Sequence, residues 1–111
     1  MVNQFEMIIV TTPDLPGREI AEVLDIVRGS TVRARHIGRD IFAGLKNIVG
    51  GEIHGYTELM SDAREQALDR MIADAADLGA DAVINVRFMT SMVMTGASEI
   101  LAYGTAVKLH K

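Results

Sequence analysis

Two segments near the end of the chain, Ala82–Met94 and Glu99–Leu109, alternate like β-strands but are apolar on both faces. In the first segment, one face carries Ile84, Val86 and Phe88, and the opposite face carries Val83 and Met89. In the second segment, one face carries Ile100, Ala102 and Ala106, and the opposite face carries Leu101, Tyr103, Val107 and Leu109. A two-layer α+β domain covers only one face of its sheet, and its other face is usually polar. We therefore expect further copies of the chain to cover the second face.

The first part of the chain predicts two more strands. Phe5–Thr12 is a short apolar run that ends in the turn-forming segment Pro13–Gly17. The next segment, Glu19–Arg35, fits either a helix or a strand buried on both faces, and its many β-branched residues favour the strand. In that strand, Gly29 and Ser30 would form a bulge or a bend.

Two helices are predicted between these pairs of strands. Asp40–Gly51 is a short helix, because its apolar residues recur at helical spacing and a pair of glycines ends it. Thr57–Leu78 is the clearest element, and Gly79 follows it where a left-handed C-cap belongs. Its apolar stripe consists of Met60, Ala63, Ala67, Leu68, Met71, Ala75 and Leu78. The alanines in this stripe predict that the helix packs closely against its neighbour.

With a compact turn at residues 95–98, the predicted order is strand–strand–helix–helix–strand–strand. This order indicates a two-layer α+β fold in a single domain spanning residues 1–111, which is a usual domain size. The chain has no uncharged apolar run long enough to cross a bilayer, so no membrane association is expected. No basic region followed by an apolar one opens the sequence, and we therefore expect a cytoplasmic protein.

Composition excludes several kinds of chemistry. The chain has no cysteine, which rules out disulfides, thiolate zinc sites, iron–sulfur clusters and a cysteine nucleophile. Fifteen acidic residues against eleven basic ones give a formal net charge of −4, which argues against a dedicated nucleic-acid-binding protein. Aromatic residues make up only 5% of the chain, too few for a platform on which bases stack.

The most basic segment lies where the second predicted strand leads into the first predicted helix. Its site candidates are Arg33, Arg35, His36 and Arg39. A helix N-terminus and adjacent guanidinium groups together could bind an anion. Alternatively, these arginines form ion pairs with acidic residues of the Thr57–Leu78 helix, on the same or a neighbouring subunit. We favour this interface interpretation, because residues 57–81 hold seven acidic residues and two basic ones.

The candidate metal ligands are Glu52, His54 and Glu58, after the first predicted helix. On an extended segment, Glu52 and His54 would lie on one face. Imidazole and carboxylate ligands suit zinc, nickel or manganese. The spacing matches no established ligand motif, and the alternative is that His54 is simply solvated. The sequence itself requires no cofactor.

Other functional patterns are weak or missing. Met92 and Met94 form a methionine-x-methionine pair, and thioether sulfur is a ligand for Cu(I), but methionines more often serve as adaptable packing. The sequence contains no nucleophile elbow, phosphate-binding loop or dinucleotide fingerprint. We therefore expect no enzymatic activity.

The stretch GSTVRARHIGRDIFAGLKNIVGGE, residues 29–52, resembles the signature of the YbjQ-like family. The resemblance continues through YTEL at 56–59, ARE at 63–65, LGADAV at 78–83 and LAYGTAV at 101–107. It implies a dodecin-like α+β subunit, assembly into a ring-shaped homopentamer, and the heavy-metal binding for which the family is named. The absence of cysteine departs from what a soft-metal site would need.

Two classes of function are therefore open from the sequence. The first is a non-enzymatic homo-oligomer, expected to be a pentamer, that binds a metal ion or a small anion at its subunit junctions. The second is a structural ring that binds a partner protein and no small ligand. An enzyme with a site shared between subunits ranks third, because the sequence shows no catalytic pattern.

Overall fold

The structure, a computed structural model, describes residues 5–34 and 54–111 and shows an α+β fold. Its elements in the described residues are β1 (Ile8–Ile9), β2 (Ile20–Ala34), α2 (His54–Asp77), β3 (Ala82–Met94) and β4 (Ala97–Leu109). The strands form one mixed sheet in the order β1-β3-β4-β2, in which β1 is parallel to β3 and the other pairs are antiparallel. The helix predicted at Asp40–Gly51 lies outside the described residues.

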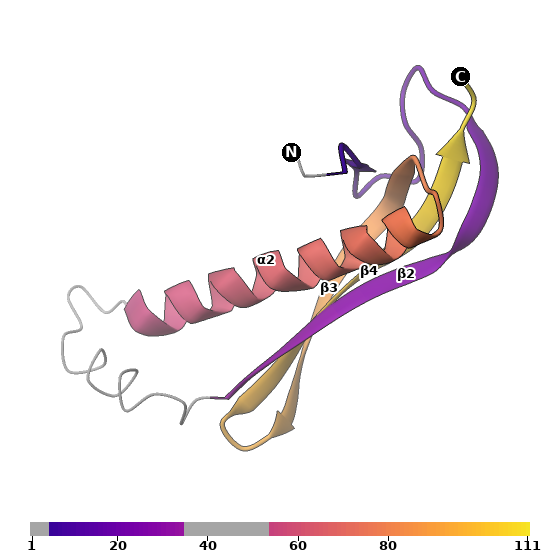
Figure 1. Cartoon of the computed structure of the whole chain (residues 1–111). Helices are drawn as coiled ribbons and strands as arrows, with labels where there is room; N and C mark the ends of the chain where they lie inside the picture. Colours follow the sequence, from indigo (N-terminus) through magenta and orange to yellow (C-terminus); the bar gives the residue numbers. More distant parts are fainter. Residues whose placement is uncertain (1–4, 35–53) are drawn as a thin grey trace.

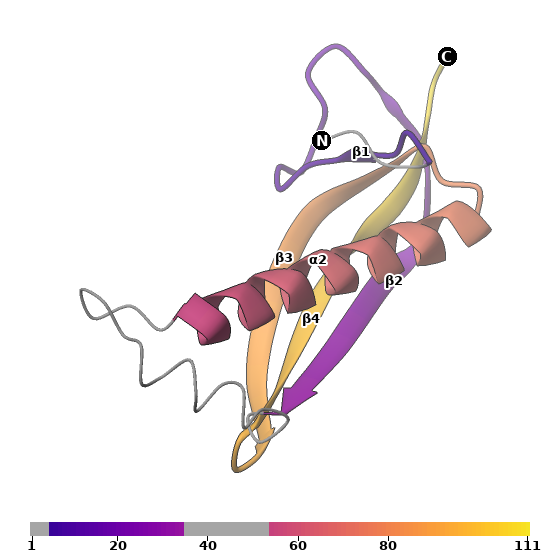
Figure 2. The same cartoon turned by 60° about the vertical axis from the view of Figure 1, so that its left-hand side comes forward.

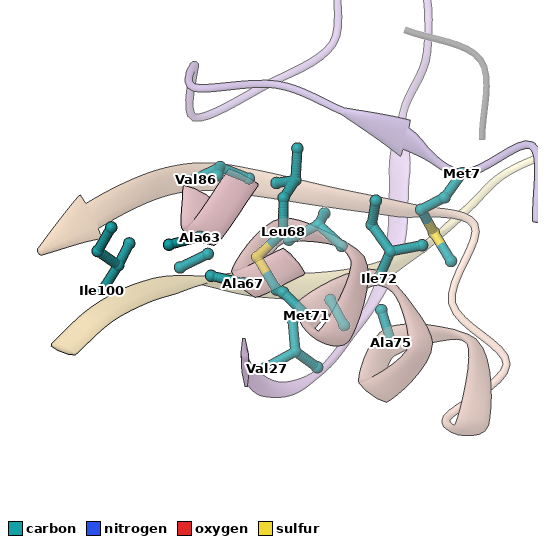
Figure 3. Close-up of a cluster of buried hydrophobic side chains, with 13 residues drawn as sticks. Met7, Val27, Ala63, Ala67, Leu68, Met71, Ile72, Ala75, Val86 and Ile100 are labelled. Atoms are coloured by element: carbon teal, nitrogen blue, oxygen red, sulfur yellow. The ribbon is translucent and has the colours of Figure 1, made fainter. Parts of the chain in front are cut away.

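The helix α2 lies along one face of the sheet and packs mainly on β2 and β4 (Figure 1). The view turned by 60° shows the same two layers (Figure 2). The core between the layers is a continuous set of buried apolar side chains (Figure 3). It comprises Met7, Val27, Ala63, Ala67, Leu68, Met71, Ile72, Ala75, Val83, Val86, Ile100, Ala102 and Ala106. This arrangement confirms the two-layer prediction for the described part of the chain.

The predicted stripe of α2 is largely the face that it buries. Ala63, Ala67, Leu68, Met71 and Ala75 are buried, and Met60 packs against them. The exception is Leu78, the last residue of the stripe. Its side chain is 42% exposed, because the helix ends one residue earlier, at Asp77. The sequence reading also omitted one buried residue of the helix, Ile72.

The predicted left-handed C-cap is present at the end of α2. Gly79 has a φ of 76°, a backbone conformation that is unfavourable for residues with a Cβ atom. Its N–H donates to the carbonyl of Ala76 at 3.0 Å, and the N–H of Ala80 donates to the carbonyl of Ala75 at 3.1 Å. These two bonds are the Schellman pattern, which satisfies carbonyl groups that the helix end would leave unpaired.

The segment with ambiguous periodicity is a strand, as its β-branched residues favoured. The prediction of a bulge at Gly29 and Ser30 is wrong, because the register with β4 runs without a shift from Asp25 to Ala34. The irregularities of β2 lie near its start instead, between Ile20 and Glu22 and between Val23 and Asp25. Gly29 serves another purpose, since a Cβ on it would overlap the backbone of α2 at Ala67 and Met71.

The predicted faces of β3 require a correction. Asn85 has a φ of 54° and lies within a register shift between Ile84 and Arg87. This irregularity moves Val86 to the same side as Val83, so that both contact the helix. The bulge thus breaks the alternation that the sequence reading assumed, which had grouped Val86 with Ile84.

The hairpin between β3 and β4 is tighter than the sequence predicted. Met94 pairs directly with Ala97, so only Thr95 and Gly96 form the turn. The last strand therefore begins at Ala97, two residues before the predicted Glu99.

The N-terminal segment pairs with β3 over a longer stretch than β1 itself. Hydrogen bonds join the N–H of Val10 to the carbonyl of Val83 and the N–H of Asn85 to the carbonyl of Thr12, each at 3.0 Å. The strand predicted at Phe5–Thr12 is therefore only partly regular, with Ile8–Ile9 as its strand portion. Ile8, Val10, Leu15 and Ile20 pack on a second buried cluster, formed by Ala82, Ile84, Val107 and Leu109. The chain itself thus covers one end of the sheet's second face.

The outer edge of β2 is held by side chains of α2. The N–H of Arg28 donates to Oδ2 of Asp74 at 3.2 Å, and Nη1 of Arg70 donates to the carbonyl of Ser30 at 2.5 Å. Asp74 and Arg70 are one helical turn apart, so a single stretch of helix satisfies both backbone groups. The middle of this edge strand is therefore occupied by the chain's own side chains.

Candidate functional site

The sheet face opposite α2 is left open by the described residues beyond the N-terminal cover. We call it the open face. Its members are Val23, Ile26, Arg28, Ser30 and Val32 of β2, Glu99, Leu101, Tyr103 and Thr105 of β4, and Arg87, Met89 and Ser91 of β3. Their neighbours Val27, Thr31 and Ala102 are buried under α2, which fixes the side on which these alternating residues lie.

Apolar side chains stand out on the open face. Val23 and Ile26 are 63% and 68% exposed, and Val32 and Met89 each expose more than half of their surface. Several large apolar side chains thus lie in water on one face of the sheet, where polar residues are usual. The prediction that the sheet is apolar beyond its helix-covered face is confirmed at these positions. The described chain covers only one end of that face.

The tip of the β3–β4 hairpin is a second exposed apolar region. Met92, Val93 and Met94 are all exposed, with Met92 the most exposed at 77%, and Phe88 further along β3 is exposed as well. These methionines do not fill the core formed by the described residues. A bulge between Met92 and Met94 also interrupts the regular alternation that a paired thioether site would use.

Among the predicted arginines, Arg33 is the one that the structure describes. It lies near the end of β2, and its Nη2 donates to Oε1 of Gln66 on α2 at 2.7 Å. This contact joins the strand to the helix, but its acceptor is an amide and not one of the acidic residues that the interface interpretation names. Arg35, His36 and Arg39 lie outside the described residues, so the anion and interface interpretations of the cluster both stay predictions.

Of the predicted metal ligands, Glu52 lies outside the described residues. His54 is the first residue of α2, so the extended backbone that the prediction assumed for it is replaced by helix. Glu58 lies four residues further along the same helix, which is one turn. Within the described ranges, no three histidine, aspartate or glutamate side chains come together as a metal site would require.

Arg87 is a basic residue of the open face that the sequence reading did not single out. Its Nη1 donates to the carbonyl of Thr11 at 2.8 Å and to the carbonyl of Val86 at 2.9 Å. These bonds tie the N-terminal segment to β3 and fix the position of the guanidinium group. Regular alternation from Val83 would place Arg87 on the same face as Val83. The bulge at Asn85 moves Arg87 to the opposite face, so the sequence pattern alone did not indicate its position.

No helix in the described ranges combines the length and the apolar character needed to cross a bilayer.

Comparison with known proteins gives matches along nearly the whole chain. A UPF0145 protein of Archaeoglobus fulgidus is 65% identical over 105 residues, which cover 95% of this chain and 97% of the relative. A UPF0145 protein of Photobacterium profundum is 63% identical over 103 residues, which cover 93% of this chain and all of the relative. Neither name states a catalytic activity.

A solved structure shares the fold. A protein of unknown function from Pediococcus pentosaceus, assigned to the DUF74 family, superposes with a TM-score of 0.63 at 18% identity. The match covers 94% of this chain and 98% of that one. The YbjQ family model, described as "Putative heavy-metal-binding", matches residues 7–110. The chain therefore belongs to the YbjQ family, to which these UPF0145 proteins also belong.

Proposed function

We propose that this protein is a homo-oligomer, assembled through its open face into a pentameric ring, that binds a metal ion or a small ligand at its subunit junctions. The observation that carries the assembly is the exposure of Val23, Ile26, Val32 and Met89 on one sheet face. Burying apolar surface releases about 25 cal/mol per Å², so leaving these side chains in water is costly. A second copy would remove them from water.

The charges of the chain support contact between copies. The outward side of α2 carries the exposed acidic residues Asp62, Glu65, Asp69 and Asp77. Arg33 lies near the end of β2 and already contacts α2 within its own chain, and Arg35 and Arg39 follow it in the sequence as further complementary charges. In this proposal Arg35 and Arg39 pair with acidic residues of a neighbouring copy.

The metal part of the proposal rests on His54, Glu58 and Glu52. Residues four apart on a helix share a face, which is the spacing at which two helical side chains can ligate one ion. Imidazole and carboxylate ligands suit zinc, nickel or manganese, which need no thiolate. The description of the family model as heavy-metal-binding agrees with such a site.

Multi-angle light scattering tests the assembly. A pentamer of this 12.1 kDa chain has a mass of about 60 kDa, and a stable monomer at micromolar concentration would refute the proposal.

The Arg35→Ala variant tests the arginine contacts. We expect weaker assembly, because removing one partner of a buried ion pair costs about 3–5 kcal/mol. If the arginines instead form an anion site, sulfate would raise the melting temperature of the wild type saturably, and Arg35→Ala would lose this effect but remain assembled.

Elemental analysis tests the metal part. The protein should be purified without an affinity tag, since a histidine tag binds the same metals. Stoichiometric zinc, nickel or manganese that disappears in the His54→Ala variant would support the site. An assembled protein free of metal would instead favour a structural ring that binds a partner protein.

A further inference from the structure

Two arginines and a tyrosine lie side by side on the open face. Tyr103 of β4 pairs with Arg28 of β2 on one side and with Arg87 of β3 on the other. Directly opposed residues in antiparallel strands are about 4.5–5.5 Å apart at their Cα atoms, so the two arginines flank the tyrosine across about 10 Å. The side chain of Arg28 is long enough to bring its guanidinium group over the phenol, whereas the guanidinium group of Arg87 is bonded to Thr11 and offers its remaining donors from the other side of the tyrosine.

The rows on either side of these three residues carry no charge. One row is Ile26, Thr105 and Ile84, and the other is Ser30, Leu101 and Met89. The two guanidinium groups therefore have uncharged and mostly apolar neighbours in these rows, without a carboxylate among them. A charge in such surroundings gains more from an ionic partner than a charge on a fully polar surface does.

Two acidic residues near Arg28, Asp25 of the same strand and Asp74 of α2, bind backbone groups. Oδ2 of Asp74 accepts the backbone N–H of Arg28, and Oδ1 of Asp25 accepts the N–H of Ile26 at 2.7 Å. Both carboxylates thus bind backbone groups of β2. Among the described residues, the guanidinium group of Arg28 has no hydrogen bond or ion pair of its own.

The second arginine of the row is held in place and still has donors to offer. Arg87 uses its Nη1 for the carbonyls of Thr11 and Val86. Its Nη2 and Nε make no hydrogen bond within the part of the chain that the structure describes. The hydroxyl of Tyr103 is likewise unbonded there. An anchored guanidinium group, a free one and a phenol together present the donors that an oxyanion accepts.

We infer that Arg28, Tyr103 and Arg87 form a binding site for the oxyanion of a small organic ligand, a phosphate or carboxylate attached to an apolar group. The guanidinium groups and the phenol would bind the oxyanion, and Ile26, Leu101 and Met89 would contact the apolar group. This site names a ligand class for the open face and rests on the proposed function only in its location. If a second copy covers that face, the ligand would be enclosed at a subunit junction.

Isothermal titration calorimetry with phenyl phosphate tests the inference, with inorganic phosphate as the comparison probe. We expect saturable binding of one phenyl phosphate per chain, tighter than that of inorganic phosphate because Ile26, Leu101 and Met89 of the neighbouring rows are apolar. The Arg28→Gln variant should bind about tenfold more weakly or worse, as loss of a hydrogen bond to a charged group predicts. Tyr103→Phe should weaken binding by a smaller factor.

The control variant is Arg64→Gln, which removes an exposed arginine of α2 on the other side of the molecule. It should bind phenyl phosphate as the wild type does, because only nonspecific attraction would be affected. No saturable binding to the wild type, or an equal loss in Arg28→Gln and Arg64→Gln, would overturn the inference.

Light scattering on the same samples separates this inference from the proposed assembly. A monomer that binds phenyl phosphate would refute the assembly and leave the anion site intact. An oligomer that does not bind it would overturn the anion site alone. If Arg28→Gln dissociates an oligomer that binds neither probe, the partner of Arg28 is a carboxylate of another copy, and the inference is wrong.

Discussion

Gly29 of β2 lies directly against Ala67 of α2, so closely that a methyl group on the glycine would overlap the carbonyl oxygen of Ala67. The backbone nitrogen of Met71 is equally close to that position. Backbone atoms cannot rotate away as a flexible side chain can. The helix therefore rests on the strand at a distance that only glycine permits at this position.

The Gly29→Ala variant should be less stable than the wild type. The added methyl group would force α2 away from β2, and overpacking of this kind costs about 1–3 kcal/mol. Urea unfolding followed by circular dichroism measures the change. Ser30→Ala, one residue along the same strand, is the control and should stay within about 0.5 kcal/mol. Equal stability of Gly29→Ala and the wild type would show that the helix is not held so closely.

Thr31 offers a test of a buried hydroxyl group. Thr31 is 2% exposed, and its Oγ1 has no hydrogen-bond partner among the described residues. Replacing the hydroxyl by a methyl in Thr31→Val should therefore raise the free energy of unfolding, by about 1 kcal/mol. The matched variant Val27→Thr adds a hydroxyl at another buried position of the same strand face and should lower it by about 1–3 kcal/mol. A less stable Thr31→Val would mean that the hydroxyl does have a partner.

The C-cap of α2 gives a graded prediction. Gly79→Ala places a Cβ in the left-handed conformation and should cost about 1–2 kcal/mol of stability. Gly79→Asn should cost less, because asparagine tolerates this conformation better than alanine. Thermal unfolding of the two variants measures the difference. The reverse order of stability would contradict the strain argument.

The open face can be tested by adding a charge. Ile26→Asp places a carboxylate among the exposed apolar side chains. If a second copy covered this face, the carboxylate would be buried without an ionic partner. We expect this variant to remain folded and to lose its assembled mass in light scattering. Ser61→Asp adds the same charge to the exposed side of α2 and should assemble normally. Unchanged assembly of Ile26→Asp would place the subunit contact elsewhere.

Metal binding through His54 predicts a pH dependence. Only the neutral imidazole ligates a metal, and an unperturbed imidazole takes up a proton near pH 6.5. Zinc affinity should therefore be constant at higher pH and fall about tenfold for each pH unit below about 6.5. Calorimetric titrations at several pH values measure this slope. Saturable binding with the same affinity at pH 5 and pH 7.5 would exclude histidine as a ligand.

The elements with a strong local signal were predictable from the sequence. The apolar stripe of α2 appears on the buried face because a single period of 3.6 residues extends through Ala63, Ala67, Met71 and Ala75. Its glycine C-cap was equally clear. The strand β2 followed from its β-branched residues, although its periodicity was ambiguous.

Features that depend on pairing between strands were not predictable. A bulge at Asn85 changes the face of the residues that follow it in β3 up to Met92, and no local sequence signal marks it. The row formed by Arg28, Tyr103 and Arg87 depends on a second shift, between Met92 and Met94, and on the register of three strands. Counting back from the Met94–Ala97 pair without the shift between Met92 and Met94 would pair Tyr103 with Phe88 instead of Arg87.

The contact between Asp74 and the N–H of Arg28 has a consequence for how this protein opens. In most strands, an amide hydrogen is shielded by the neighbouring strand, and its exchange with deuterium reports the opening of the sheet. The amide of Arg28 is shielded by a helix side chain instead. Its exchange rate would therefore report the moments at which α2 lifts away from an intact sheet. One amide of an edge strand thus measures the docking of the helix, separately from the unfolding of the sheet beneath it.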